Sequence, residues 1–294
     1  MFRLLKIFPF RMAEIHKTVS GSMPTADFVR ATSATGDLRL HKFRSRIFRN
    51  TRYLRAWLPP GYDDPANAER RYPVFYLNDG QNLFEVSTAF TGVEWQVDET
   101  ADRLIREGAV PPMIIVGIDN AGRDRIREYM PHRSMNPVML RVQGRHYPDF
   151  LMNEVMPFVE ARYRAATGPE NTGLGGSSLG SLIALYTVIV RPGVFGRLLL
   201  ESPSLWAAHR QLIRESRTVR IWPERVFLGV GTSEAGSAER SRTVVDDVRE
   251  LAAIIRRAVL SEKRLHVVIK DGAGHNESAW AERFPEALQF LFGQ

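Results

Sequence analysis

Four short runs of mostly apolar residues, spread along the chain, constrain its fold most. They occupy residues 73–78, 113–118, 197–201 and 225–230. Runs of this length are typical of strands that are buried on both faces of a parallel sheet. Segments with helical spacing of apolar residues lie among and after these runs, at residues 97–106, 149–163, 242–260 and 280–291. The alternation predicts an α/β protein with a mostly parallel central sheet and helices on both faces.

The N-terminal part of the chain has a different pattern. Residues 38–58 alternate β-type residues with arginines and end in the turn Leu58-Pro-Pro-Gly-Tyr62, which predicts an antiparallel hairpin that opens the sheet. Residues 1–36 lack clear periodicity, so we expect an N-terminal arm followed by one catalytic domain over residues 37–294. Residues 1–60 hold twelve Lys or Arg against three Asp or Glu. We interpret these cations as the solvated face of edge strands, because no nucleic-acid-binding module accompanies them.

Composition excludes several classes of protein. The chain has no cysteine, which removes disulfides, thiolate catalysis and zinc–thiolate sites. No stretch approaches the roughly 18 to 20 apolar residues that span a bilayer. The first eleven residues make a poor secretory signal, because Lys6, Pro9 and Arg11 interrupt the apolar segment. We therefore expect a cytoplasmic protein, with secretion left open, and the sequence leaves the oligomeric state open, a homodimer included.

A catalytic motif lies near the middle of the chain. Gly176-Ser-Ser-Leu-Gly180 fits Gly-x-Ser-x-Gly and is followed by apolar residues at helical spacing. A serine at such a strand-to-helix turn is held in a strained conformation, because a side chain at either flanking position would collide with neighbouring backbone. The motif predicts Ser178 as an exposed nucleophile.

A serine nucleophile needs a base, and three histidines follow it in the chain. His275 lies in a glycine-rich loop directly after a predicted strand at residues 264–269, where an open α/β sheet places its reactive groups. His266 alternates within that strand, and His209 lies early in a possible helix. We predict His275 as the base.

The acid that orients the base is expected at the end of another strand. The strand at residues 226–230 ends in Gly231-Thr-Ser-Glu234, which puts a carboxylate in the loop beside that of His275. Asp271 remains an alternative, although an Asp-Gly pair is more typical of a turn. We therefore predict Glu234 as the acid of a Ser-His-Glu triad.

The oxyanion of the tetrahedral intermediate needs two backbone amides, each worth about 10²- to 10³-fold in rate. One should be the amide of Leu179, which follows the nucleophile. The other should come from the loop over residues 78–84, after an early buried strand, where Gly80 allows close approach of the backbone. We predict the amide of Gly80 or Gln81.

Taken together, these segments resemble the putative esterase family of α/β-hydrolases, a group similar to esterase D, feruloyl esterases, enterochelin-type esterases and the antigen 85 mycolyltransferases. The resemblance covers about residues 38–292 and is carried by the motifs at residues 58–62, 72–84, 176–180, 202–206, 231–234 and 274–280. It implies Ser178, Glu234 and His275 as the triad, an oxyanion hole from the loop at residues 79–82 and a pocket near Trp206. Ser181 departs from the family pattern, in which many members have a glycine.

Five further residues are candidates for substrate contact, and each has a structural alternative. Trp95 and Trp206 could instead be packing residues, and Arg127 could be the partner of a nearby acid. The candidates are Asn82, Trp95, Arg127, Tyr129 and Trp206.

The sequence thus favours a cofactor-independent carboxylic ester hydrolase that forms an acyl-enzyme and acts on a small-molecule ester. Alternatives within the class are an enterochelin-like siderophore lactone esterase, a feruloyl or acetyl-sugar esterase, and an acyltransferase. An alternative from another class is a non-catalytic binding protein on a hydrolase scaffold. We expect no metal, because no cluster of His, Asp and Glu has the spacing of ligands.

Overall fold

The computed structural model describes residues 28–31, 33–133, 141–259 and 262–293. Nine strands of this part form one sheet in the order β1-β2-β3-β5-β4-β6-β7-β8-β9. The strands are β1 (Val29–Arg30), β2 (Asp37–Arg44), β3 (Thr51–Leu58), β4 (Val74–Asn78), β5 (Ile114–Ile118), β6 (Thr172–Ser177), β7 (Arg197–Glu201), β8 (Arg225–Ser233) and β9 (Leu265–Gly274). Pairing is antiparallel from β1 through β3 to β5 and parallel from β5 to β9.

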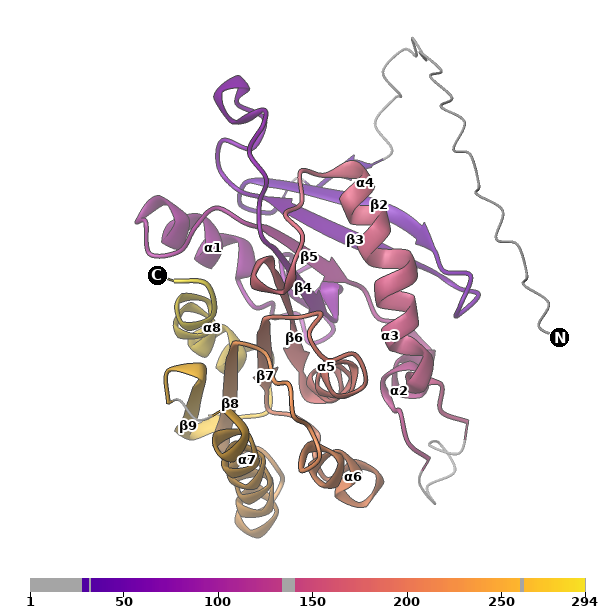
Figure 1. The fold of residues 1–294 in the computed structure, drawn as a ribbon, viewed down its shortest axis with the longest axis vertical. Helices are drawn as coiled ribbons and strands as arrows, with labels where there is room; N and C mark the ends of the chain where they lie inside the picture. The colour runs from indigo at the N-terminus through magenta and orange to yellow at the C-terminus, as the bar shows by residue number, and fades with distance from the viewer. Residues whose placement is uncertain (1–27, 32, 134–140, 260–261, 294) are drawn as a thin grey trace, which may run out of the picture.

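Helices cover both faces of the sheet. They are α1 (Val97–Arg106), α2 (Arg125–Tyr129), α3 (Tyr147–Phe150), α4 (Met156–Arg162), α5 (Ser178–Val190), α6 (Ala207–Ser216), α7 (Ala238–Val259) and α8 (Glu277–Phe292). Helices α1 and α8 lie on one side of the sheet, and α3, α4 and α5 lie on the other (Figure 1).

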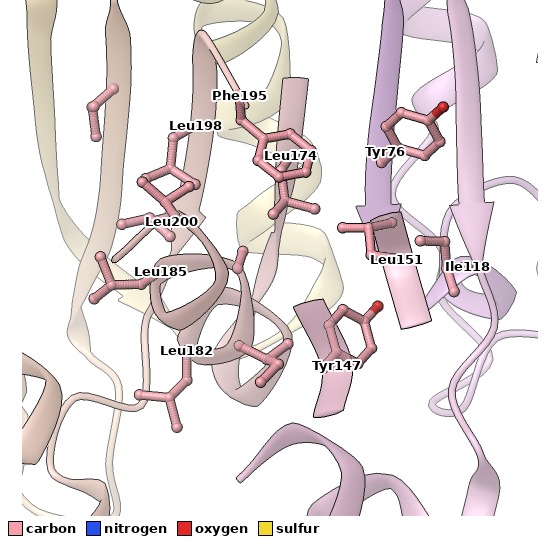
Figure 2. Close-up of a cluster of buried hydrophobic side chains, with 14 of the residues drawn as sticks. Tyr76, Ile118, Tyr147, Leu151, Leu174, Leu182, Leu185, Phe195, Leu198 and Leu200 are labelled. Atoms are coloured by element: carbon pink, nitrogen blue, oxygen red, sulfur yellow. The ribbon is translucent and has the colours of Figure 1, made fainter. Parts of the chain in front are cut away.

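The sheet separates two hydrophobic clusters. Along β4, Val74 and Tyr76 belong to the larger cluster, whereas Phe75 and Leu77 belong to the smaller one. This alternation follows from the two-residue period of a strand. Figure 2 shows part of the larger cluster, where side chains of the strands meet those of α5 and of residues 147–151. Strands β4, β5 and β7 are buried along almost their whole length and are mostly apolar, as expected for strands covered on both faces, whereas the edge strand β9 is only partly buried.

The predicted fold class is confirmed. The hairpin over residues 38–58 corresponds to β2 and β3, and β7 and α1 have the predicted bounds. β1 pairs with β2 through Val29 and Leu40, so the first strand of the described sheet lies within residues 1–36, the segment expected as an N-terminal arm. Residues 1–27 of that segment lie outside the described residues.

Candidate active site

Ser178 lies at the turn between β6 and α5, where it is the first residue of the helix. Its φ of 54° lies in the left-handed region, which costs energy for a residue with a side chain. The turn packs closely on the end of β4: a Cβ on Gly180 would lie 2.8 Å from Asp79 Oδ2 and 3.1 Å from Asn78 Cβ. Glycine at this position therefore lets the turn approach the loop that follows β4.

Glu234 and His275 meet because of the way β8 and β9 pair. The two strands are in regular register up to Gly231 and Lys270, and they pair again at Ser233 and Gly274 after a shift. The residues that follow this last pair are Glu234 and His275, and His275 Nδ1 lies 2.6 Å from Glu234 Oε2. Asp271 is in the shifted segment and accepts a hydrogen bond from Thr232 Oγ1 at 2.9 Å.

The environment of Glu234 favours its ionised form. Burial alone would raise the pKa of this carboxyl, but the hydrogen bonds with His275, Ser202 and Gly231 outweigh burial and lower the pKa below its usual value. Ser202 Oγ donates to Glu234 Oε1 at 2.7 Å, and the Gly231 amide donates to the same oxygen at 2.6 Å. An ionised carboxylate can only accept, so His275 Nδ1 is the donor in this contact, and in the neutral imidazole Nε2 is the nitrogen that can accept a proton.

Ser202 connects Glu234 to α8. Its hydroxyl accepts a hydrogen bond from Trp280 Nε1 at 2.9 Å while donating to the carboxylate. The Trp280 ring also contacts His275 edge-on, with ring centroids 5.2 Å apart. The sequence contained no signal for this role of Ser202, because its partners lie 32 and 78 positions further along the chain.

Ser178 and His275 line one cavity of about 730 Å³. Its walls include Gln81 and Asn82 after β4, residues of the loop at 88–91, and residues of the segment at 119–126. Ser178 Oγ lies 3.3 Å from Ser204 Oγ. The structure therefore brings the predicted nucleophile and the predicted base to one cavity, with Glu234 buried behind the imidazole at 1% side-chain exposure.

The loop after β4 is held in an unusual conformation. Asp79 has a φ of 59°, and Gly80 opens a short 3₁₀ turn over Gly80–Asn82. A Cβ on Gly80 would lie 2.6 Å from the Gly117 carbonyl carbon, so only glycine fits against β5. The amides of Gly80, Gln81 and Leu179 all belong to first helical turns, whose N–H groups lack partners within the helix.

An ion pair with the partly buried Arg125 fixes the buried Asp79. Arg125 Nε lies 2.7 Å from Asp79 Oδ1 and Arg125 Nη2 lies 2.8 Å from Oδ2. Asn120 Nδ2 donates to Oδ1 at 2.7 Å, and the Asp79 amide donates to the Tyr129 hydroxyl at 3.3 Å. No local pattern marks Asn120 and Arg125, because they lie 41 and 46 positions further along the chain.

Of the predicted substrate contacts, the structure places some at the cavity and others away from its described lining. Asn82 lines the cavity, whereas Trp95, Arg127 and Trp206 are not among its described lining residues. Trp95 is 2% exposed and packs against Trp280 in the smaller hydrophobic cluster. Arg127 Nε donates to the Arg141 carbonyl at 3.0 Å, and Trp206 is 52% exposed before α6.

Sequence reasoning missed other residues of the lining. They are Thr88, Phe90, Thr91, Asp119, Asn120, Gly122, Arg123, Arg125, Ile126, Glu277 and Trp280. They come from loops, from short helical turns and from the first turn of α8, where apolar periodicity carries little information.

Within the described ranges, one group of carboxylates is spaced closely enough to hold a metal. Ligand atoms of Glu94, Asp98 and Glu99 lie within 4.8 Å of one another at the start of α1. None of the three lines the cavity. Burial, followed by the neighbouring Glu99, raises the pKa of Asp98 to about 8, so a shared proton also accounts for this cluster.

Comparison with known proteins assigns the family. The family described as putative esterase matches residues 45–291. The uncharacterized protein YbbA of Bacillus subtilis is 25% identical over 265 residues, which cover 88% of this chain and 97% of YbbA. The ferri-bacillibactin esterase BesA of the same organism is 25% identical over 225 residues, covering 69% of this chain and 73% of BesA.

Solved structures share the fold. The enterobactin esterase FES from Shigella flexneri, crystallised in the presence of enterobactin, superposes with a TM-score of 0.65 at 21% identity. The match covers 86% of this chain and 58% of the Shigella protein, so the chain spans little more than half of that relative. Among the residues that the structure describes, no helix is both long enough and apolar enough to cross a bilayer.

Proposed function

The chain belongs to the putative esterase family, and we propose that it is a serine carboxylic ester hydrolase whose triad is Ser178, His275 and Glu234. The contact of 2.6 Å between His275 Nδ1 and Glu234 Oε2, beside a cavity that Ser178 also lines, carries the proposal. Family membership assigns an esterase, and the triad is our assignment within it.

In the acylation step, Ser178 Oγ attacks the ester carbonyl carbon while His275 Nε2 takes the proton of the Ser178 hydroxyl. The imidazolium that forms is stabilised by the ionised Glu234. The same imidazolium then gives its proton to the alcohol oxygen as the carbon–oxygen bond breaks. The alcohol leaves, and an acyl group remains on Ser178.

Water completes the reaction by the same route in reverse. His275 removes a proton from the attacking water, and the Ser178 oxygen leaves with a proton from the imidazolium. In both steps the carbonyl oxygen carries negative charge, which the amides of Leu179 and of Gly80 or Gln81 would stabilise. The left-handed conformation of Asp79 and the close packing of Gly80 support this role for the loop after β4.

A siderophore ester is a second candidate substrate class, with feruloyl and acetyl-sugar esters as further ones. Two similar proteins are named as ferri-bacillibactin esterase and enterobactin esterase. Arg123 lines the cavity as an exposed cation, which would favour an anionic substrate. Hydrolysis of a ferric triscatecholate lactone, compared with hydrolysis of methyl ferulate, discriminates these candidates. An added acceptor alcohol tests for acyl transfer by the appearance of a new ester.

The decisive experiment replaces the nucleophile. Ser178→Ala should abolish hydrolysis of p-nitrophenyl acetate and labelling by a fluorophosphonate, with an unchanged circular dichroism spectrum. Ser204→Ala is the matched control, because Ser204 Oγ lies 3.3 Å from Ser178 Oγ and should not be labelled in its place. Turnover near the wild-type rate in Ser178→Ala would contradict the proposal, and a wild-type protein that is neither labelled nor active would favour a non-catalytic binding protein.

A further inference from the structure

Phe90 is the most exposed of the large hydrophobic side chains in the described ranges, at 89%. It lies in the segment between η2 (Gly80–Asn82) and α1, and it lines the same cavity as Ser178 and His275. An aromatic ring that is exposed to water at a cavity can lose this contact with water when a ligand covers it, which favours binding of the ligand.

The loop that carries Phe90 is tied down on both sides of that residue. The Phe90 amide donates to Asn82 Oδ1 at 3.0 Å, and Thr88 Oγ1 donates to the Gln81 carbonyl at 2.7 Å. Thr91 Oγ1 donates to Glu277 Oε2 at 3.0 Å. The ring is therefore presented by a preorganised backbone, which reduces the entropy lost when a ligand contacts it.

The hydrogen bond from Thr91 to Glu277 places the loop that carries Phe90 on the side of His275. Glu277 opens α8 two residues after His275, and its second carboxylate oxygen accepts a hydrogen bond from Asn82 Nδ2 at 3.4 Å. In the proposed reaction, His275 protonates the oxygen of the departing alcohol, so the alcohol portion must lie on the imidazole side of Ser178.

We propose that Phe90 contacts the alcohol portion of the ester and makes the enzyme selective for esters of apolar, above all aromatic, alcohols. This inference rests on the proposed function, since it takes its direction from the role of His275. Phe90 acts only while the alcohol is present, so it contributes to acylation and not to hydrolysis of the acyl-enzyme.

The test compares two esters that yield the same acyl-enzyme. Phe90→Ala should lower kcat/KM for 1-naphthyl acetate by about 2- to 10-fold relative to kcat/KM for methyl acetate. Phe90→Leu should lower this relative kcat/KM by a smaller factor, because leucine keeps an apolar side chain at the position. The rate at which the acetyl-enzyme is hydrolysed, measured after a burst of p-nitrophenyl acetate, should equal that of the wild type in both variants.

Val86→Ala is the matched control, because Val86 is a 59% exposed apolar residue of the same loop that is not among the described lining residues. It should leave the ratio of the two kcat/KM values unchanged. An unchanged ratio of the two kcat/KM values in Phe90→Ala would overturn the inference. A fall in the rate of acetyl-enzyme hydrolysis as large as the fall in kcat/KM would also overturn it, because Phe90 would then contact the acyl portion. Both outcomes leave the proposed function intact, whereas a wild-type enzyme that forms no acetyl-enzyme would refute the function itself.

Discussion

Arg125 donates hydrogen bonds to both carboxylate oxygens of Asp79, with Nε at 2.7 Å from Oδ1 and Nη2 at 2.8 Å from Oδ2. Asp79 is 4% exposed and immediately precedes Gly80, the start of the proposed oxyanion loop. The ion pair therefore connects the segment at residues 119–126 to the backbone that would stabilise the oxyanion.

Removing the guanidinium should weaken both the fold and catalysis. In Arg125→Ala the Asp79 carboxylate stays buried and, among the described residues, keeps Asn120 alone as a side-chain partner, so we expect a loss of about 3 kcal/mol in the free energy of unfolding. A shifted amide would lower kcat for p-nitrophenyl acetate by about 10-fold or more. Urea unfolding and steady-state kinetics measure the two effects.

Arg103→Ala is the control for this variant. Arg103 is 52% exposed in its side chain and pairs with Glu107 at 3.3 Å on the surface of α1. The free energy of unfolding should change by less than about 0.5 kcal/mol, because exposed ion pairs contribute little. Equal effects of the two substitutions would contradict the role given to Arg125.

Ser202→Ala should make stability less dependent on pH. The pKa of Glu234 is lowered in the folded protein, so its contribution to stability is present above the unfolded pKa of about 4.5 and is lost as pH falls through the folded value. Without the Ser202 hydroxyl the pKa is lowered less. At pH 7 we expect the free energy of unfolding of Ser202→Ala to be lower than that of the wild type by about 1.5 to 3 kcal/mol, since the lost hydrogen bond is made to a charged group.

The deficit should shrink at pH 3, where the carboxyl is increasingly protonated in both proteins. Urea unfolding at the two pH values measures it. A deficit of the same size at pH 7 and pH 3 would mean that the hydroxyl acts only by packing or through Trp280, and not through the charge of Glu234.

Ser181→Ala should stabilise the protein. Ser181 is fully buried in α5, and none of the described residues offers a hydrogen-bond partner to its Oγ. Removing a buried hydroxyl without a partner and adding alanine to a helix both favour the folded state, by about 1 kcal/mol together. The midpoint of thermal unfolding should rise, with the hydrolysis of p-nitrophenyl acetate unchanged.

Ser216→Ala provides the contrast, because Ser216 is equally buried but its Oγ donates to the Leu212 carbonyl at 2.7 Å. It should show no such gain. A lower midpoint for Ser181→Ala than for the wild type would show that the hydroxyl has a partner in solution, such as an ordered water.

The centre of the parallel sheet was predictable because β4, β5 and β7 are buried almost throughout and are mostly apolar. The strand at residues 197–201 and the helix at 97–106 have the predicted bounds. In contrast, β1 has two residues, too few for any period to appear. Its pairing with β2 depends on the tertiary structure alone.

The candidate site was predictable only where a residue follows a strand. The sequence favoured Glu234 over Asp271 as the partner of His275, but the contact itself depends on the register shift between β8 and β9, which no sequence pattern marks. It also could not separate Trp95, which is buried, from Trp206, which is exposed, since tryptophan suits both environments. Phe90 lies in a loop and Arg125 opens the five-residue helix α2, so neither had an apolar pattern to mark it.

Trp280 gives the site an optical signal of its own. Its ring meets His275 edge-on at 5.2 Å, and its indole nitrogen is bonded to Ser202. Trp280 therefore contacts both the proposed base and the residue that binds Glu234, so a displacement of either side chain changes the surroundings of this indole.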